Sequence, residues 1–183
     1  MNTNTHVGPS FSRSNRFARL LWGLTYLMLF RYSPIPLHEW RSFILRLFGA
    51  KIGEGVHVYP AVRIWAPWNL EIKDHAGIAS GVNLYAQGKI LIGRKTVISQ
   101  GSHLCAGTHD YTREGFPLYT KPIVIGDEVW IAADVFVHPG VSIGNGTVVG
   151  ARSVVTRSLP EWKVCSGHPC IPVKNRVLHR NEL

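Results

Sequence analysis

The sequence predicts an all-β fold, a solenoid in which short extended segments are stacked as coils. An aliphatic residue recurs at every sixth position late in the chain, at Ile125, Ile131, Val137, Ile143, Val149 and Val155. A strand repeats its facing every two residues and a helix about every 3.6, so a period of six indicates short strands joined at regular corners. A sandwich with casually spaced aliphatic residues would show drift in this phase.

A second set of residues supports the same prediction. Small or β-branched residues lie four positions after the aliphatic ones, as a second inward position in a tight corner requires. They are Val129, Val135, Val141, Thr147 and Ser153. The period also continues upstream with two advances of two residues each, through Ile52, Val58, Ile64, Leu70, Ile72, Ile78, Leu84, Ile90, Ile92, Ile98 and Leu104.

Residues 1–50 precede the repeat, and we expect a helical segment there. Residues 16–32 are rich in Leu, Phe and Trp. Their continuous apolar run is about eleven residues long, which is too short to span a bilayer. Pro34 and Pro36 end this helix. A second, amphipathic helix is expected over residues 37–48, where the apolar residues at helical spacing are Trp40, Phe43, Ile44, Leu47 and Phe48.

Two interpretations of the helical segment are open, and both can hold. The helices can cap the end of the solenoid, where the first coil would otherwise expose unpaired strand edges. The first helix is also flanked by Arg13, Arg16, Arg19 and Arg31, so it can lie on an anionic membrane surface near a lipid-linked sugar. The second interpretation predicts a peripheral membrane contact.

The β-helix domain is expected over residues 51–170, with one loop that leaves it. Aliphatic pairs mark the same point of successive coils. Leu70 and Ile90 are 20 residues apart, whereas Ile90 and Ile123 are 33 apart, so one coil carries 13 extra residues. A continuous coil has no room for them, and we expect a protruding loop at about residues 108–122. His109 lies at its base.

Charge and cysteine content restrict the function. The formal net charge is +9, and residues 171–183 are expected to form a basic C-terminal tail. The chain has no recognised nucleic-acid-binding motif, so its late basic residues suit a smaller polyanion and no nucleic-acid partner is expected. Cys165 and Cys170 could form a disulfide in an exported protein, but two small apolar residues in a corner region are the preferred interpretation.

Several motifs together carry a family resemblance. They are Leu-Arg-Leu-Phe-Gly-Ala-Lys-Ile-Gly at residues 45–53, Gly-Thr-His at 107–109, Ile-Gly-Asp-Glu-Val-Trp-Ile-Ala at 125–132 and Gly-His-Pro-Cys at 167–170. With these motifs the chain resembles the hexapeptide-repeat acetyltransferases. Among them it is similar to the galactoside, maltose and nodulation sugar O-acetyltransferases, and more so to the colanic acid biosynthesis acetyltransferases.

The resemblance implies a left-handed parallel β-helix, which is an exception to the right-handed crossover rule. It also implies a homotrimer, with acetyl-coenzyme A in the groove between neighbouring subunits. The implied activity is an acetyl-CoA-dependent O-acetyltransferase that acts on a sugar hydroxyl of a glycan or polysaccharide precursor. The sugar acceptor can be a small molecule or lipid-linked.

His109 is the candidate catalytic residue. An alcohol is a poor nucleophile at neutral pH, so acetyl transfer to a hydroxyl needs a base, and histidine is best suited to that role. The resemblance places His109 at the position of the family's catalytic histidine. The expected mechanism is direct attack of the acceptor oxygen on the thioester. Asp110, Glu114 or a backbone carbonyl could orient the imidazole.

The resemblance also implies contacts to acetyl-CoA. The backbone at Ala133 and Ala151 is expected to meet the pantetheine arm. Thr156 and Arg157 are expected near the adenine and the phosphates. Lys174 falls where the family places a phosphate-facing arginine. An arginine can bind a phosphate with two parallel hydrogen bonds, whereas the lysine in this chain offers a single compact positive charge.

Other positions are candidates for the acceptor and the groove. Asn83, Tyr85 and Gln87 are the nearest polar residues for sugar hydroxyls, on the coil before His109. Trp130 matches a family tryptophan beside the groove, although a packing aromatic is an equally good interpretation.

Two alternative functions differ from acetyl transfer in what they predict. A noncatalytic solenoid that only presents a binding surface would release no thiol. A zinc site like that of the γ-type carbonic anhydrases needs three histidines at a spacing that His103, His109 and His138 do not match, so no metal is expected. No cleavable signal is evident, and the expected location is the cytoplasm, at the inner membrane surface if the first helix contacts lipid.

Overall fold

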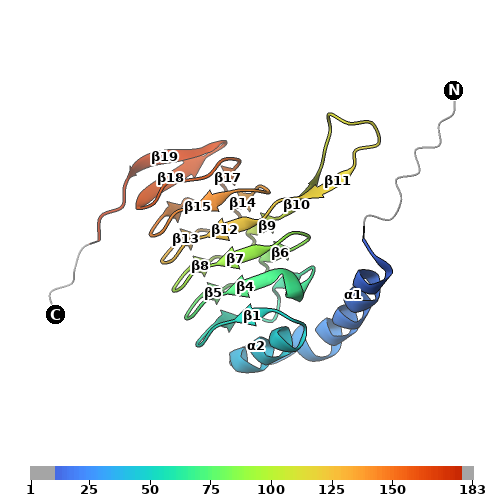
Figure 1. The fold of residues 1–183 in the computed structure, drawn as a ribbon. Helices are drawn as coiled ribbons and strands as arrows, with labels where there is room; N and C mark the ends of the chain where they lie inside the picture. The colour runs from blue at the N-terminus through green and yellow to red at the C-terminus, as the bar shows by residue number, and fades with distance from the viewer. Residues whose placement is uncertain (1–10, 179–183) are drawn as a thin grey trace.

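The structure is a computed structural model that describes residues 11–178 of the 183-residue chain. It is a left-handed parallel β-helix with helices at its N-terminal end and one hairpin that leaves the solenoid (Figure 1). Residues 179–183 of the expected basic tail lie outside the described residues.

Three sheets form the faces of the solenoid. Sheet A contains β1 (Lys51–Ile52), β4 (Leu70–Ile72), β7 (Ile90–Ile92), β12 (Ile123–Ile125) and β15 (Ser142–Ile143). Sheet B contains β2 (His57–Val58), β5 (Gly77–Ile78), β8 (Val97–Ile98), β13 (Trp130–Ile131), β16 (Val148–Val149), β18 (Lys163–Gly167) and β19 (Cys170–Asn175). Sheet C contains β3 (Arg63–Ile64), β6 (Asn83–Tyr85), β9 (His103–Cys105), β14 (Phe136–Val137) and β17 (Val154–Val155).

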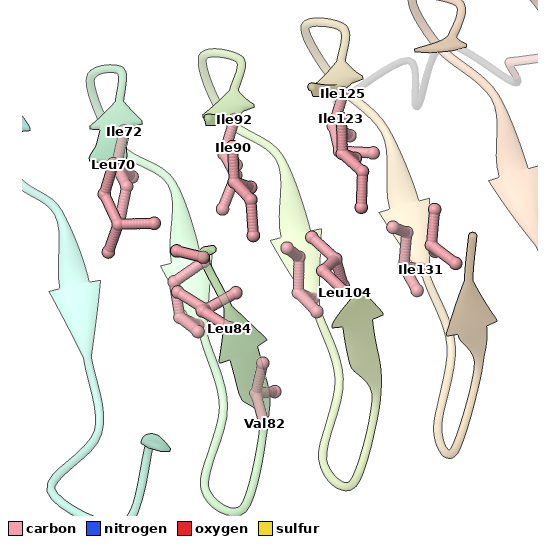
Figure 2. Packing of buried hydrophobic residues seen from close by; sticks show 14 of the residues in the cluster. Leu70, Ile72, Val82, Leu84, Ile90, Ile92, Leu104, Ile123, Ile125 and Ile131 are labelled. Carbon is pink, nitrogen blue, oxygen red and sulfur yellow. The ribbon is translucent and has the colours of Figure 1, made fainter. Parts of the chain in front are cut away.

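The six-residue period corresponds to inward positions of successive coils. Each member of the late aliphatic series is at most 2% exposed. Leu70 pairs with Ile90 in parallel register, and Ile90 pairs with Ile123. Figure 2 shows these side chains aligned coil upon coil. The register therefore continues across the 13 extra residues, as the spacing predicts.

Buried hydroxyl groups at the corners are satisfied by backbone partners. Thr147 Oγ1 donates to the carbonyl of Pro160 at 2.6 Å, and Ser153 Oγ donates to that of Gly150 at 2.7 Å. Ser102 Oγ donates to the Ala132 carbonyl at 2.9 Å. These bonds explain why small polar residues can replace valine at the second inward position.

The N-terminal helices pack against the first coil. α1 (Arg13–Thr25) continues directly into a π-helical turn, η1 (Tyr26–Phe30), and α2 (His38–Leu47) follows. Trp22 is buried, and its indole Nε1–H donates to the Ile64 carbonyl at 2.8 Å. None of the helices among residues 11–178 combines the length and apolar character needed to cross a membrane.

Helix α2 is held by a buried arginine, which sequence analysis did not identify. Arg41 is 0% exposed. Its guanidinium donates to the carbonyls of Val58, Pro34 and Ile35 at 2.6, 2.8 and 2.5 Å. A further bond of 2.9 Å reaches the hydroxyl of Ser33. Arg41 thereby ties the connection between the helices to β2 of the first coil.

The apolar residues of α2 divide between two faces. Ile44 is buried, but Trp40, Phe43 and Leu47 are exposed. The amphipathic pattern therefore does not mark the face that packs on the solenoid, because Arg41 and Ser42 occupy part of that face.

The C-terminal end of the solenoid is an antiparallel hairpin. Strand β19, most of which sequence analysis assigned to the basic tail, pairs with β18, and β18 pairs in parallel with β16. Cys165 and Cys170 are buried free thiols in this hairpin. Burial and the neighbouring Cys170 raise the pKa of Cys165 to about 11, so it is an inert packing group.

Candidate functional site

The extra residues form a hairpin that follows β9, the central strand of sheet C. Strands β10 (Gly107–His109) and β11 (Leu118–Thr120) pair antiparallel, with His109 opposite Leu118. Figure 1 shows this hairpin projecting away from the solenoid. At its base the Ala106 N–H donates to the Tyr85 carbonyl, and the Lys121 N–H donates to the Ala106 carbonyl, each at 3.2 Å. The base is therefore fixed to the coil below.

The His109 imidazole is exposed and held through one ring nitrogen. Nδ1 lies 2.6 Å from the backbone carbonyl oxygen of Phe116. A carbonyl can only accept a hydrogen bond, so Nδ1 carries a proton, and in the neutral ring the free lone pair is on Nε2. This tautomer is the one that can remove a proton from a hydroxyl at Nε2.

The carbonyl of Phe116 reaches His109 because of an uncommon backbone conformation. Phe116 has a φ of 45°, in the left-handed region that non-glycine residues rarely adopt. Its own N–H donates to the Arg113 carbonyl at 3.2 Å. Sequence analysis left the orienting group open and did not identify Phe116. The flanking Gly115 and Pro117 indicate a turn, but no sequence signal gives the direction of the carbonyl.

The carboxylate of Asp110 is engaged elsewhere. It accepts hydrogen bonds from the Thr112 hydroxyl and backbone N–H at 2.6 and 3.0 Å. These bonds hold the pKa of Asp110 below its ordinary value. Asp110 therefore stabilises the loop as an ionised turn residue rather than orienting the imidazole.

Two of the three acceptor candidates lie directly below the hairpin. The Gln87 amide donates to the Tyr85 hydroxyl at 2.7 Å, and its Oε1 is buried without a hydrogen-bond partner. The Gln87 side chain lies against Gly107, where a Cβ would come 2.9 Å from Gln87 Cβ. Asn83 lies at the opposite end of β6, with its Nδ2 at 3.5 Å from His103 Nε2.

Aromatic rings form a column on the outer face of sheet C. Tyr85, His103, Phe136 and His138 contact one another in sequence, edge to face, with centroids 5.0–5.9 Å apart. Burial lowers the pKa of His103, and the charge of Arg63 adds to this effect. His103 is therefore a neutral packing group near pH 7.

The candidates for acetyl-CoA binding do not converge within one chain. Ala133 and Ala151 stack at the corner between sheets B and C, where the Arg152 N–H donates to the Ala133 carbonyl at 2.8 Å. Thr156 and Arg157 follow β17, at the corner where the hairpin also leaves the solenoid. Trp130 and Lys174 belong to sheet B, in β13 and β19.

Trp130 and Lys174 are both exposed. The Trp130 indole N–H donates to Ser99 Oγ at 3.0 Å, and 49% of the residue remains exposed. A large exposed indole on a flat strand face is available to a ligand or to a second chain.

A pocket on sheet A is separate from His109. It is lined by Trp68, Lys89, Leu91, Pro122, Val124 and neighbouring backbone, and it contains no histidine. We place the candidate catalytic site at the hairpin because His109, the candidate catalytic residue of the sequence analysis, lies there. In residues 11–178 no three His, Cys, Asp or Glu side chains cluster closely enough to hold a metal ion.

The fold and the site together define a class of protein, the hexapeptide-repeat transferases. A family model described as bacterial transferase hexapeptide (six repeats) matches residues 122–157. An Escherichia coli protein named "Putative colanic acid biosynthesis acetyltransferase WcaF" is 48% identical over 93% of this chain and 94% of its own. The chain belongs to the hexapeptide-repeat acetyltransferases.

Other relatives agree with this assignment. The galactoside O-acetyltransferase of Escherichia coli is 32% identical over 82% of this chain and 75% of its own. A hexapeptide-repeat acetyltransferase of Vibrio cholerae, solved in complex with acetyl-coenzyme A, superposes with a TM-score of 0.83. It is 27% identical, and the match covers 91% of each chain.

Proposed function

We propose that this acetyltransferase moves the acetyl group of acetyl-CoA to a hydroxyl of a sugar in a glycan or polysaccharide precursor, with His109 as the general base. The observation that supports the general-base role is the 2.6 Å contact between His109 Nδ1 and the Phe116 carbonyl, which leaves Nε2 available as the base. The names of the two sequence relatives, one for colanic acid biosynthesis and one for galactosides, support a sugar acceptor.

The chemistry is a direct transfer. Nε2 of His109 removes the acceptor hydroxyl proton while the oxygen attacks the thioester carbonyl carbon. The carbon–sulfur bond then breaks, and the departing thiolate takes the proton back from the imidazolium. The products are a sugar acetate and coenzyme A. The Phe116 carbonyl stabilises the imidazolium during this sequence, because its bond to Nδ1–H strengthens as the ring becomes charged.

Acceptor recognition is proposed for Tyr85 and Gln87. Both lie below the hairpin, and the buried Gln87 Oε1 has no hydrogen-bond partner in the structure. A sugar hydroxyl that donates to this oxygen would satisfy it. Asn83 is a more distant candidate, because it lies at the far end of β6.

We also propose that a homotrimer completes the site, with a second chain supplying part of the acetyl-CoA groove. The separation of the candidate residues supports this proposal, since Ala133 and Ala151 lie at a different corner from the hairpin. Arg157 and Lys174 are suited to the phosphates of coenzyme A, and the Ala133 and Ala151 corner to its pantetheine arm.

The general-base role is tested by thiol release from acetyl-CoA with a panel of free, nucleotide-linked and lipid-linked sugars. His109→Ala is expected to lower kcat by about 10² to 10⁴ while coenzyme A still raises the melting temperature. Asp110→Asn and Glu114→Gln are matched controls in the same hairpin and are expected to retain the rate. A His109→Ala enzyme with wild-type kcat would refute the proposal.

A site shared between two chains is tested by mixing two variants that are each expected to be inactive. His109→Ala lacks the base, and Ala151→Trp blocks the acetyl-CoA groove. If each site uses two chains, random reassembly into trimers restores about a quarter of wild-type activity. If each chain holds a whole site, the mixture stays inactive.

A further inference from the structure

The outward side of the N-terminal helices carries several exposed apolar residues. Along α1 and η1, Phe17, Leu20, Leu24 and Met28 follow helical spacing and are 63%, 60%, 49% and 69% exposed. The opposite side of the same helix carries the buried Trp22 and Phe30. The helix therefore has apolar residues on both sides, and the solenoid covers only one of them.

Helix α2 extends this surface. The Trp40 indole N–H donates to the Leu29 carbonyl at 3.0 Å, which joins the two helices. The Trp40 ring stacks with that of Phe43 at 6.1 Å, and both are at least 40% exposed. We call this surface the outer apolar face and define it by Phe17, Leu20, Leu24, Met28, Trp40 and Phe43.

Positive charge flanks the outer apolar face. Arg13 begins α1 and Arg31 follows η1, and both are exposed. Arg16 is also exposed on α1. The first fifty residues contain a single acidic residue, Glu39. An amphipathic helix with arginines beside exposed Leu, Phe and Trp side chains is the pattern of a segment that lies in the headgroup region of an anionic bilayer.

The charge pattern favours a lipid surface over a second copy of the chain. The core of a protein interface is depleted in charge, whereas arginines at the edge of a membrane-bound face extend their charged ends to the headgroups. Trp40 is suited to the same depth, because its indole combines an apolar body with a polar group.

The hairpin lies on the same side of the solenoid as α1. Trp22 bonds to Ile64 at the end of β3, and Arg19 lies over the adjoining Trp65 at 4.3 Å. The hairpin follows β9, two coils further along the same sheet. Figure 1 shows both at one edge of the molecule. A membrane that holds the helices therefore lies on the side from which His109 projects.

We propose that α1, η1 and α2 lie in the plane of an anionic membrane surface, with the outer apolar face in the headgroup region and Arg13, Arg16 and Arg31 on phospholipid phosphates. The test is flotation of the full chain with vesicles of phosphatidylcholine and phosphatidylglycerol, and with vesicles of phosphatidylcholine alone. The wild-type chain is expected to float with the anionic vesicles and to be released by high salt.

Two variants separate the apolar and the charged contributions. Leu20→Gln with Leu24→Gln and Met28→Gln is expected to weaken vesicle binding roughly a hundredfold, about fivefold for each half-exposed side chain. Arg13→Gln with Arg31→Gln is expected to reduce the preference for anionic vesicles by about fivefold per arginine. Ile171→Gln with Val173→Gln and Val177→Gln is the matched control and is expected to bind as the wild type does, since these exposed residues lie at the other end of the solenoid.

Three results would overturn the proposal. The first is the absence of the wild-type chain from the floating fraction. The second is vesicle binding by the triple glutamine variant of α1 and η1 that equals that of the wild type. In the third, that variant lowers the mass measured by light scattering, which would assign the face to a second copy. Thiol release with an acceptor free in solution and without vesicles is expected to be equal in all these variants, so a failure here leaves the acetyl-transfer proposal standing.

Discussion

The hydrogen bond between His109 and Phe116 can be tested without changing the imidazole. Proline at position 116 would fix φ at about −65°, far from the observed 45°, and would therefore turn the carbonyl away from Nδ1. It would also remove the N–H that donates to Arg113. Phe116 is 60% exposed, so the substitution removes little buried surface. Glycine at this position adopts positive φ freely and serves as the matched control.

The expected magnitude follows from the charge that develops on the ring. A hydrogen bond to a charged group contributes about 1.5–3 kcal/mol, and each 1.36 kcal/mol corresponds to roughly a factor of ten in rate. Phe116→Pro is therefore expected to lower kcat by about 10- to 100-fold, less than the loss of the imidazole itself. Phe116→Gly is expected to keep most of the rate, because the carbonyl can stay in place.

Two measurements check this prediction. Thiol release gives kcat for both variants, and nitrogen NMR of the histidine ring reports which nitrogen carries the proton. We expect a Nδ1–H tautomer in the wild type and in Phe116→Gly, and a mixture of tautomers in Phe116→Pro. If Phe116→Pro keeps its rate, or if Phe116→Gly loses as much as Phe116→Pro does, the carbonyl is not the orienting group.

Three further predictions concern the frame that holds the site. Gly107→Ala places a methyl group against Gln87 and is expected to lower the melting temperature. Adding Gln87→Gly, which removes both the amide and the Cβ that the methyl group meets, should restore part of it; no recovery would show that the clash is elsewhere. Arg41→Met removes four hydrogen bonds of the buried guanidinium and is expected to cost about 3–4 kcal/mol in urea unfolding, while Arg16→Met on the exposed side is expected to be near neutral. Burial lowers the pKa of His103 below 6.5, so the unfolded chain takes up that proton first and stability falls as the pH drops below about 6.5. In thermal melts, the melting temperature of a His103→Gln variant should fall less on acidification than that of the wild type. An equal fall would contradict this linkage.

The solenoid was predictable because its sequence pattern repeats. A period of six, kept over many coils, identifies the inward positions, and the distances between aliphatic pairs locate the extra residues to within a few positions. Strand β19 was assigned to a tail because the antiparallel hairpin it forms does not follow the period. The environment of Arg41 was not predictable, since its partners come together only in the folded chain. They are the Ser33 hydroxyl and the carbonyls of Pro34, Ile35 and Val58.

The candidate site was predictable in part. Spacing placed His109 at the base of a loop, and the structure has it in β10. The orienting carbonyl depends on one positive φ angle within the loop, a property of backbone geometry that residue types do not encode. The relation between His109 and the acetyl-CoA candidates depends on packing between chains, which a single sequence does not contain.

The insertion begins and ends at one corner, so Ile90 and Ile123 remain neighbours in register on either side of it. The register of the coils therefore does not depend on the length or conformation of the segment between residues 107 and 121. Longer, shorter or differently composed excursions can be exchanged at this point while the coils beneath stay unchanged. The junction therefore offers a graft point for engineered segments that keep His109 and the Phe116 carbonyl that contacts it.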